Sequence, residues 1–237
     1  MDDGIGRWQV VRDAVAGLAD LLLPVRCAGC GSAGTGWCTS CHGQLCGLLR
    51  VERPLFGPAL PVRALGRYRD AARRAVLAYK ESGRRDLAVP FGRCMATAAG
   101  IMIPESGNGH RRAETCWLVP APSRASASRQ RGGAHMARVG RRTVSALVEA
   151  GQAAALADCL ALGRGTRDSV GLGPAERVRN LSGRVLLRTG RLPPPYAPVV
   201  LIDDVITTGA TAVSCVRALE SAGVQVSAVL ALTATAS

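Results

Sequence analysis

Residues 198–232 carry the pattern that most constrains the fold of this chain. The segment "PVVLI" (198–202) is a continuous apolar run entered through proline, as expected of a strand buried on both faces of a parallel sheet. Apolar residues then recur at helical spacing over 213–222, and Gly223 can end that helix in the left-handed conformation. The run "VQVSAVLAL" (224–232) supplies the next strand. A strand, a helix and a second strand in this order predict an α/β domain.

The sequence before residue 198 also alternates between strand-like and helical segments. Strand-like pieces occupy 62–68 and 115–120, and helical periodicity covers 7–23, 70–82, 87–103 and 134–150, with a loop predicted over 187–198. Short buried strands separated by helices favour a mainly parallel sheet flanked by helices. The proline-bounded stretch "RPLFGP" (53–58) is typical of a linker. We therefore predict an amino-terminal unit over 1–55 and an α/β domain over 56–237.

Two carboxylates and a run of small residues follow the strand at 198–202. Asp203 and Asp204 stand directly after the apolar run and can accept hydrogen bonds from neighbouring ribose hydroxyls, with Mg²⁺ balancing their charge mainly through substrate oxygens. The loop that opens the next helix is Thr207, Thr208, Gly209, Ala210 and Thr211. Its backbone N–H groups and hydroxyls suit a phosphate at a helix terminus. The pattern thus favours a sugar-phosphate site over an ordinary strand-turn-helix connection.

Nine cysteines make up the second conspicuous feature. The start of the chain lacks the pattern of a secretory signal, so we expect reduced thiols or a metal site. Cys27, Cys30, Cys38 and Cys41 form two Cys-x2-Cys knuckles whose thiolates can close a tetrahedron around a structural Zn²⁺, with four unligated thiols as the alternative.

The remaining candidates for metal ligands are weaker. His42 and Cys46 are either substitute ligands or bystanders. The scattered cysteines 94, 116, 159 and 215 lie in apolar contexts that suit buried small hydrophobic residues better than nucleophiles.

Charge is the third feature. The net charge is +13, and residues 63–142 hold 17 basic side chains against 5 acidic ones. Such a segment suits a polyanion such as nucleic acid or pyrophosphate, or else forms a solvated arginine-rich surface. Apolar stretches are too short to span a bilayer, so we expect a cytoplasmic protein without membrane insertion.

The motif at 199–211 resembles the phosphoribosyl-pyrophosphate (PRPP) motif of type I phosphoribosyltransferases. With the cysteine knuckles in front of it, the chain looks like the ComF family of competence proteins. The segments "YRDAARRAVLAYK" (68–80), "LVPAPSR" (118–124), "RQRGGAHMA" (129–137) and "ERVRN" (176–180) are similar to family segments and follow in the same order. Nearly the whole chain is covered by the resemblance.

The resemblance implies a type I phosphoribosyltransferase-like fold with a small amino-terminal zinc knuckle, and roles for particular residues. Asp203 and Asp204 would hold the ribose during catalysis, and residues 207–211 would bind the 5′-phosphate. Pyrophosphate would lie on Ala121, Pro122, Ser123, Arg124 and Arg131. A hood over about 62–82 would carry Lys80, the only lysine in the chain.

Two departures from the family pattern concern the second substrate. The chain reads Arg-Gly-Gly-Ala-His over 131–135 where the family usually has Arg-Gly-Phe-Asn-Gln, and a glutamine common before "ERVRN" is missing. His135 either replaces a lost hydrogen-bond donor or lies on a helix surface. These changes affect the identity of an acceptor more than the binding of PRPP.

Three functions follow as expectations from this resemblance. The first is Mg²⁺-dependent phosphoribosyl transfer from PRPP to an unknown acceptor. The second is a non-catalytic DNA-uptake factor that binds single-stranded DNA or a competence helicase. The third is a PRPP-sensing regulator, since one fold hosts enzymes and non-enzymes alike.

Overall fold

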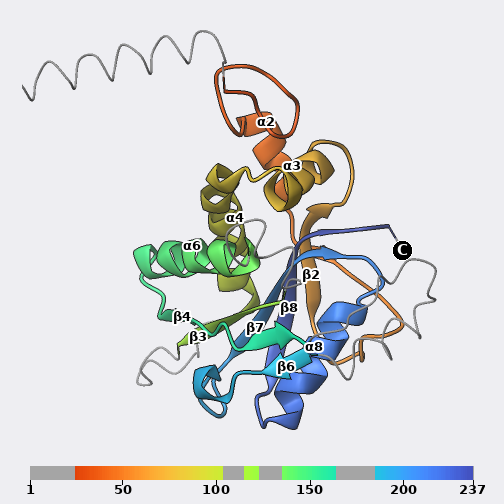
Figure 1. Cartoon of the computed structure of the whole chain (residues 1–237), viewed down its shortest axis with the longest axis vertical. Coiled ribbons are helices and arrows are strands. Elements are labelled where there is room, and N and C mark those ends of the chain that lie inside the picture. The colour runs from red at the N-terminus through yellow and green to blue at the C-terminus, as the bar shows by residue number, and fades with distance from the viewer. Residues whose placement is uncertain (1–24, 104–114, 123–134, 164–184, 237) are drawn as a thin grey trace, which may run out of the picture.

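A computed structural model describes residues 25–103, 115–122, 135–163 and 185–236 (Figure 1). Its strands are β1 (Leu49–Arg50), β2 (Val62–Arg67), β3 (Cys116–Pro120), β4 (Ala154–Leu156), β5 (Leu160–Leu162), β6 (Val185–Leu187), β7 (Val199–Ile206) and β8 (Val226–Ala234). Its α-helices are α2 (Thr39–His42), α3 (Asp70–Glu81), α4 (Ala88–Met102), α6 (His135–Glu149) and α8 (Ala210–Ser221). Short 3₁₀ turns are η1 (Gly43–Leu45), η2 (Arg85–Leu87) and η3 (Thr189–Arg191).

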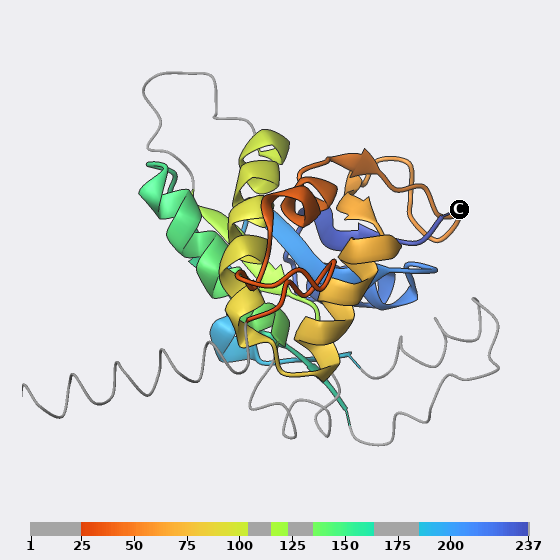
Figure 2. The same ribbon diagram turned by 90° about the horizontal axis from the view of Figure 1, so that it is seen from above.

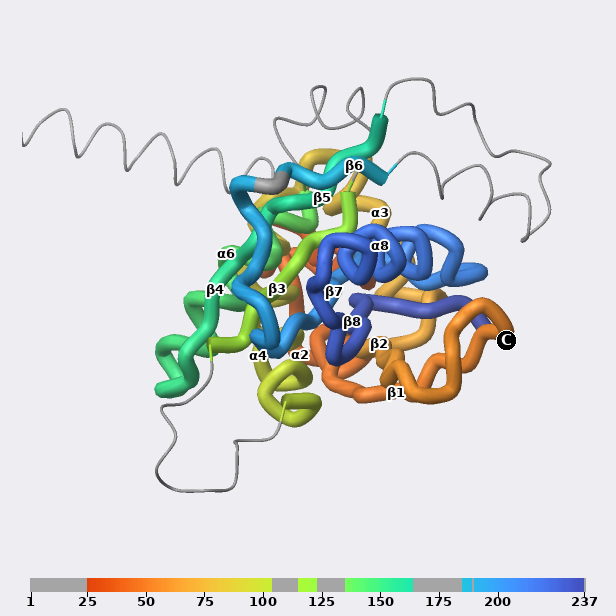
Figure 3. The backbone as a smooth tube through the Cα atoms, turned by 90° about the horizontal axis from the view of Figure 1, so that it is seen from below, coloured from red at the N-terminus to blue at the C-terminus, as the bar shows by residue number. Residues whose placement is uncertain are grey.

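Six strands form one sheet in the order β1-β2-β8-β7-β3-β4 (Figure 3). The edge strand β1 pairs antiparallel with β2, and every other neighbouring pair in this sheet is parallel. A separate antiparallel pair joins β5 to β6. The predicted α/β architecture with a mainly parallel sheet is therefore confirmed.

Helices cover both faces of the sheet, as the buried character of β7 requires. Val200 and Ile202 pack into the cluster that includes α3, α4 and α6. Val199 and Leu201 point the other way, into the cluster that includes α8. Successive strand residues alternate between faces, so one apolar run supplies two cores. Figure 2 shows α3, α4 and α6 together on the upper side of the molecule.

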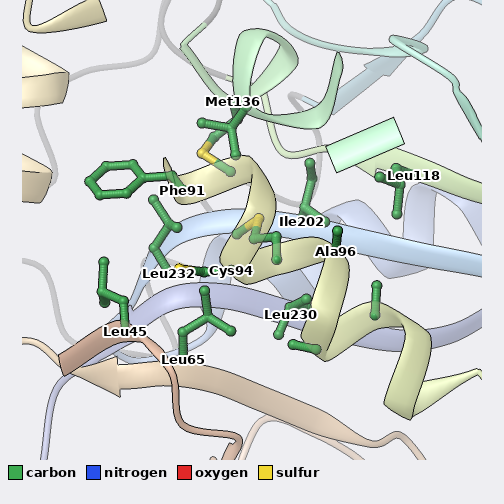
Figure 4. Close-up of a cluster of buried hydrophobic side chains, with 14 of the residues drawn as sticks. Leu45, Leu65, Phe91, Cys94, Ala96, Leu118, Met136, Ile202, Leu230 and Leu232 are labelled. Atoms are coloured by element: carbon green, nitrogen blue, oxygen red, sulfur yellow. The ribbon is translucent and has the colours of Figure 1, made fainter. Parts of the chain in front are cut away.

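The larger core lies beneath α4 (Figure 4). Phe91, Leu118, Ile202 and Leu230 are each fully removed from solvent. The helices α4 and α6 cross closely at Gly92, which has no side chain. A Cβ at this position would lie only 2.4 Å from the Cβ of Arg142. This contact fixes α6, whose first residue is a site residue, against α4.

The predicted elements correspond closely to the observed ones in four helices and four strands. The main difference is that β7 continues to Ile206, beyond the predicted end at 202. Asp203 is opposite Ala231 and Val205 is opposite Thr233 in β8, so the neighbouring strand keeps both acidic residues inside the sheet. β1, β4, β5 and β6 were not predicted, because two or three residues show no measurable periodicity.

Three other expectations concern the chain ends and connections. The predicted helix at 7–23 lies outside the described residues. The predicted boundary at 55/56 falls between β1 and β2, two strands that pair with each other. Within the described part of the chain, every helix is too short or too polar to span a bilayer.

Candidate functional site

Asp203 and Asp204 occupy the carboxyl-terminal part of β7, at the centre of the sheet. They are 8% and 6% exposed, and carboxylates are rarely buried to this extent unless they are paired. Neighbouring strand residues direct their side chains to opposite faces. Asp204 therefore lies on the side of α3 and α6, and Asp203 lies on the side of α8.

Asp204 is the centre of a buried polar cluster drawn from three elements. Its Oδ2 atom lies 2.8 Å from Lys80 Nζ on α3 and 2.7 Å from His135 Nε2 on α6. The hydroxyl of Tyr79, beside Lys80, donates to the carbonyl oxygen of His135 at 2.7 Å. Burial alone would raise the pKa of Asp204, but its interactions with His135 and Lys80 outweigh burial and hold that pKa below its usual value.

Asp203 is in the opposite electrostatic situation. Burial, with the adjacent charge of Asp204, raises the pKa of Asp203 to about 7. Its Oδ1 atom accepts a hydrogen bond from the backbone N–H of Asp204 at 2.8 Å. The pair therefore combines one firmly ionised carboxylate with one that exchanges a proton near neutral pH.

The small-residue loop lies between β7 and α8. Gly209 has φ of +82° and immediately precedes α8, and a Cβ there would meet the ring of Phe56 at 2.8 Å. Arg53 Nε donates to the carbonyl oxygen of Thr207 at 2.6 Å. The backbone N–H of Ala210 points to the hydroxyl of Thr208 at 3.4 Å. The predicted linker thus packs directly on the loop and fixes its conformation.

The start of the predicted pyrophosphate segment lies beside β7. Ala121 follows β3, is buried, and donates its N–H to the carbonyl oxygen of Ile202 at 2.8 Å. Pro122 is half-buried next to it. Ser123, Arg124 and Arg131 lie outside the described residues, so their predicted roles stay predictions. The described part places Ala121, Asp203 and Asp204 at the same carboxyl-terminal edge of the sheet.

Four cysteines converge in the segment 25–48, which we term the cysteine module. The sulfur atoms of Cys27, Cys30, Cys38 and Cys41 all lie within 4.8 Å of one another. Cys30 and Cys38 are 3.7 Å apart, close to the ~3.8 Å expected for two thiolates that share a tetrahedral ion at Zn–S of about 2.3 Å. This cluster could hold a structural metal ion such as Zn²⁺, as the spacing predicts.

Backbone donors inside the cysteine module favour thiolate over thiol at one ligand. Cys38 donates its N–H to Cys27 Sγ at 3.4 Å. Burial opposes ionisation, but backbone hydrogen bonds from Cys30, Cys38 and Gly29 outweigh it and lower the pKa of Cys27 to about 6. A thiolate is the form that binds a metal.

The cysteine module is held on the α/β body by defined contacts. Arg84 donates to the carbonyl oxygens of Arg26 and Gly36, each at 3.0 Å, and pairs with Asp86 at 2.8 Å. The ring of Trp37 meets Phe91 of α4 edge-on, with centroids 6.0 Å apart. Figure 1 shows α2 directly above α3 and α4.

Two features of the site escaped the sequence analysis. His135 is only 7% exposed and bonded to Asp204, so its interpretation as a helix-surface residue is wrong. His42, Cys46 and Cys94 form a second group whose ligand atoms lie within 4.8 Å of one another. No spacing rule links Cys94 to His42, which lies 52 positions earlier in the chain. For His135, the signals were its position at the start of an amphipathic helix and the hydrogen-bond donor missing from the family pattern, and these left its burial undecided.

Comparison with known proteins adds no family assignment. No protein-family model matches the chain, and no curated protein matches it.

Proposed function

We propose that the chain binds PRPP together with Mg²⁺ at the carboxyl-terminal edge of β7 and uses it for phosphoribosyl transfer. The observation that carries this proposal is the placement of two buried carboxylates beside a glycine loop that opens α8. Open α/β sheets bind ligands at this edge. The resemblance of residues 199–211 to the PRPP motif names the ligand.

The loop provides the chemistry for the 5′-phosphate. Residues 207–211 span the last loop residues and the first turn of α8. The backbone N–H groups at the start of a helix have no helical partners, so they can bind the 5′-phosphate. The left-handed Gly209 lets the chain turn tightly, and the Arg53 bond to Thr207 holds the loop in place. A loop already ordered before binding loses less entropy when phosphate arrives.

The carboxylates provide the chemistry for the ribose. In this proposal Asp203 and Asp204 accept hydrogen bonds from the ribose hydroxyls, and Mg²⁺, bound largely through substrate oxygens, neutralises pyrophosphate charge. Lys80 is the group that must respond to substrate. Its side chain is 36% exposed while Asp204 is 9% exposed, so the ammonium group lies on the solvent side of the pair. We infer that Lys80 turns from Asp204 to the pyrophosphate when PRPP binds.

Transfer would proceed by attack of an acceptor nucleophile on ribose C1 as the bond to pyrophosphate breaks. No covalent bond to a side chain is required, and charge on the leaving group is stabilised by Lys80 and by the segment that begins at Ala121. The resemblance to the ComF family extends the proposal to a competence-associated protein whose acceptor is unknown.

Single-stranded DNA binding is the weaker candidate for this chain. Trp37 of the cysteine module is an aromatic residue that could stack on bases. Its ring is half-buried, forms a T-shaped contact with Phe91 and packs against the clusters on either side, which leaves less of it available to a base. The net charge of +13 still allows backbone contacts, which would weaken steeply with salt.

Calorimetric titration of the full chain with PRPP and Mg²⁺ tests the proposal. We expect Asp204→Asn to abolish measurable binding, because the amide replaces a charged carboxylate that in this proposal accepts hydrogen bonds from the ribose. Glu220→Gln, an exposed acidic residue near the other end of α8, is the matched control and should bind like wild type. Equal affinity for PRPP in wild type and Asp204→Asn would contradict the proposed site.

A second measurement separates an enzyme from a PRPP-sensing regulator. Release of pyrophosphate from PRPP, followed with candidate acceptors, should require Lys80 if transfer occurs. Lys80→Met should then lower turnover more than it lowers affinity, since its charge acts on the leaving group. Binding without turnover for every acceptor would favour the regulator.

A further inference from the structure

A second group of metal-ligand side chains lies next to the four-cysteine cluster. His42 is the last residue of α2 and Cys46 follows η1, so the two lie four residues apart on one face of a continuous helical turn. Cys46 Sγ donates to the carbonyl oxygen of His42 at 3.3 Å. Cys94 comes from the middle of α4, a separate element. The three ligand atoms all lie within 4.8 Å of one another.

The distances within this group bring a thiol and an imidazole within reach of one ion. Cys94 Sγ lies 3.7 Å from Nδ1 and 3.9 Å from Nε2 of His42. A thiolate and an imidazole bound to one tetrahedral Zn²⁺, at about 2.3 Å and 2.0–2.1 Å, lie roughly 3.6 Å apart. Because Cys94 Sγ is almost equidistant from the two ring nitrogens, neither nitrogen points at a shared ion position, and the imidazole of His42 must rotate to bind a metal together with Cys94. For comparison, the sulfur atoms of Cys30 and Cys38 in the four-cysteine cluster are 3.7 Å apart.

We propose that His42, Cys46 and Cys94 form a second zinc site of the Cys₂His class, distinct from the site of the four cysteines. Two thiolates and an imidazole are a ligand set suited to Zn²⁺. Cys94 is 7% exposed, whereas Cys46 is exposed, so the ion enters from the side of Cys46 and water supplies its fourth ligand.

A hydrogen bond between thiol and imidazole is the metal-free alternative, and it accounts for less. Such a bond needs only Cys94 and His42. It does not involve Cys46, whose sulfur lies in the same small volume and is held near His42 by its own hydrogen bond to that residue's carbonyl oxygen. A metal ion uses all three groups at once.

The second ion would join two parts of the structure. The four-cysteine ligands all lie within the cysteine module, so that ion stabilises the module alone. His42 adjoins Cys41, a ligand of the first cluster, whereas Cys94 belongs to the main core beneath α4 (Figure 4). A metal bound by both would fix the orientation of the cysteine module on the α/β body.

Zinc content of the full chain is the direct test. Protein purified under reducing conditions and dialysed against Zn²⁺ should hold two zinc ions per chain. Cys46→Ser and His42→Gln should each hold one. Cys116→Ser, a buried cysteine outside both groups, is the matched control and should keep both ions. Wild-type zinc content in Cys46→Ser and His42→Gln, with circular dichroism unchanged, would overturn the proposal.

Alkylation gives an independent readout that does not depend on stoichiometry. Zn²⁺ should slow the reaction of Cys46 with iodoacetamide in the wild-type chain, and His42→Gln should remove that protection. The four-cysteine cluster is intact in His42→Gln, so its thiols should stay protected. An unchanged rate at Cys46 with and without Zn²⁺ would show that no ion binds there.

Discussion

The cysteine module and the cluster around Asp204 are assembled in opposite ways. Cys27, Cys30, Cys38 and Cys41 lie within 15 consecutive residues, so local turns alone bring them together. Asp204 meets Lys80 and His135 only because β7, α3 and α6 pack against one another. The first site can form before the rest of the chain folds, whereas the second exists only in the complete α/β body. Each should fail in its own way.

The largest expected effect comes from removing metal from the cysteine module. Structural zinc supplies an apparent ~10–16 kcal/mol in isolated zinc-finger peptides, and the module has only a small apolar cluster of its own. We expect chelation to expose the amides of residues 25–48 to hydrogen exchange while β7 and β8 stay protected. Uniform loss of protection across the chain would show that the two regions fold as one unit.

Asp203 and Asp204 should give opposite dependences of stability on pH. The folded-state pKa of Asp203 is about 7 against an unfolded value near 3.9, so folding favours its protonated form. Its effect is to lower the free energy of unfolding as pH rises from about 4 to about 7, by at most ~1.4 kcal/mol per pH unit. Asp204 has a lowered pKa, so its stabilisation is complete above about pH 4 and is lost in more acidic solution.

Urea denaturation between pH 4 and pH 8 checks this contrast. Asp203→Asn carries no titrating carboxyl, so its stability relative to wild type should increase across that window. Asp204→Asn removes one cause of the raised pKa of Asp203, so the loss of stability with rising pH should be smaller in this variant than in wild type. Parallel stability curves for wild type and Asp203→Asn would contradict the raised pKa of Asp203.

The same contrast explains what could be predicted from sequence. Spacing identified the four cysteines, and apolar periodicity identified α3, α4, α6, α8 and the central strands, because both patterns are local. The role of Asp203 and Asp204 as a pair could be suggested, but not their separation onto two faces. That depends on β8 extending to Ala234 and keeping both residues in the sheet.

Contacts between distant segments could not be predicted from cysteine spacing or apolar periodicity. Nothing in the segment 131–135 shows that His135 turns inward, because its burial depends on α6 crossing α4 at Gly92. The approach of Cys94 to His42 likewise depends on how the cysteine module sits on α4. Tertiary packing decides these positions, and a single sequence contains no direct record of it.

Gly209→Ala tests the loop that the linker holds in place. A residue with a Cβ pays about 1–2 kcal/mol for the left-handed conformation, and here it would also meet the Phe56 ring at 2.8 Å. Phe56→Ala should relieve the steric part of this cost and leave the backbone part. A double-mutant cycle by urea denaturation measures the difference. Strict additivity of the two substitutions would show that Phe56 does not touch the loop.

Tyr79→Phe gives the smallest expected effect and probes the long-range assembly most directly. The hydroxyl of Tyr79 holds the His135 carbonyl from α3, and its loss should reduce the free energy of unfolding by about 0.5–1.5 kcal/mol. Tyr196→Phe, at a residue that is 94% exposed, is the control and should have no effect on stability.

Because His135 in turn contacts Asp204, Tyr79→Phe should also weaken PRPP binding if the proposed site is correct. A loss of stability with unchanged PRPP affinity would place His135 in the fold rather than in the binding site. The zinc content of the cysteine module should not change in Tyr79→Phe, since its metal ligands are positioned by local turns and not by the packing of α3 against α6.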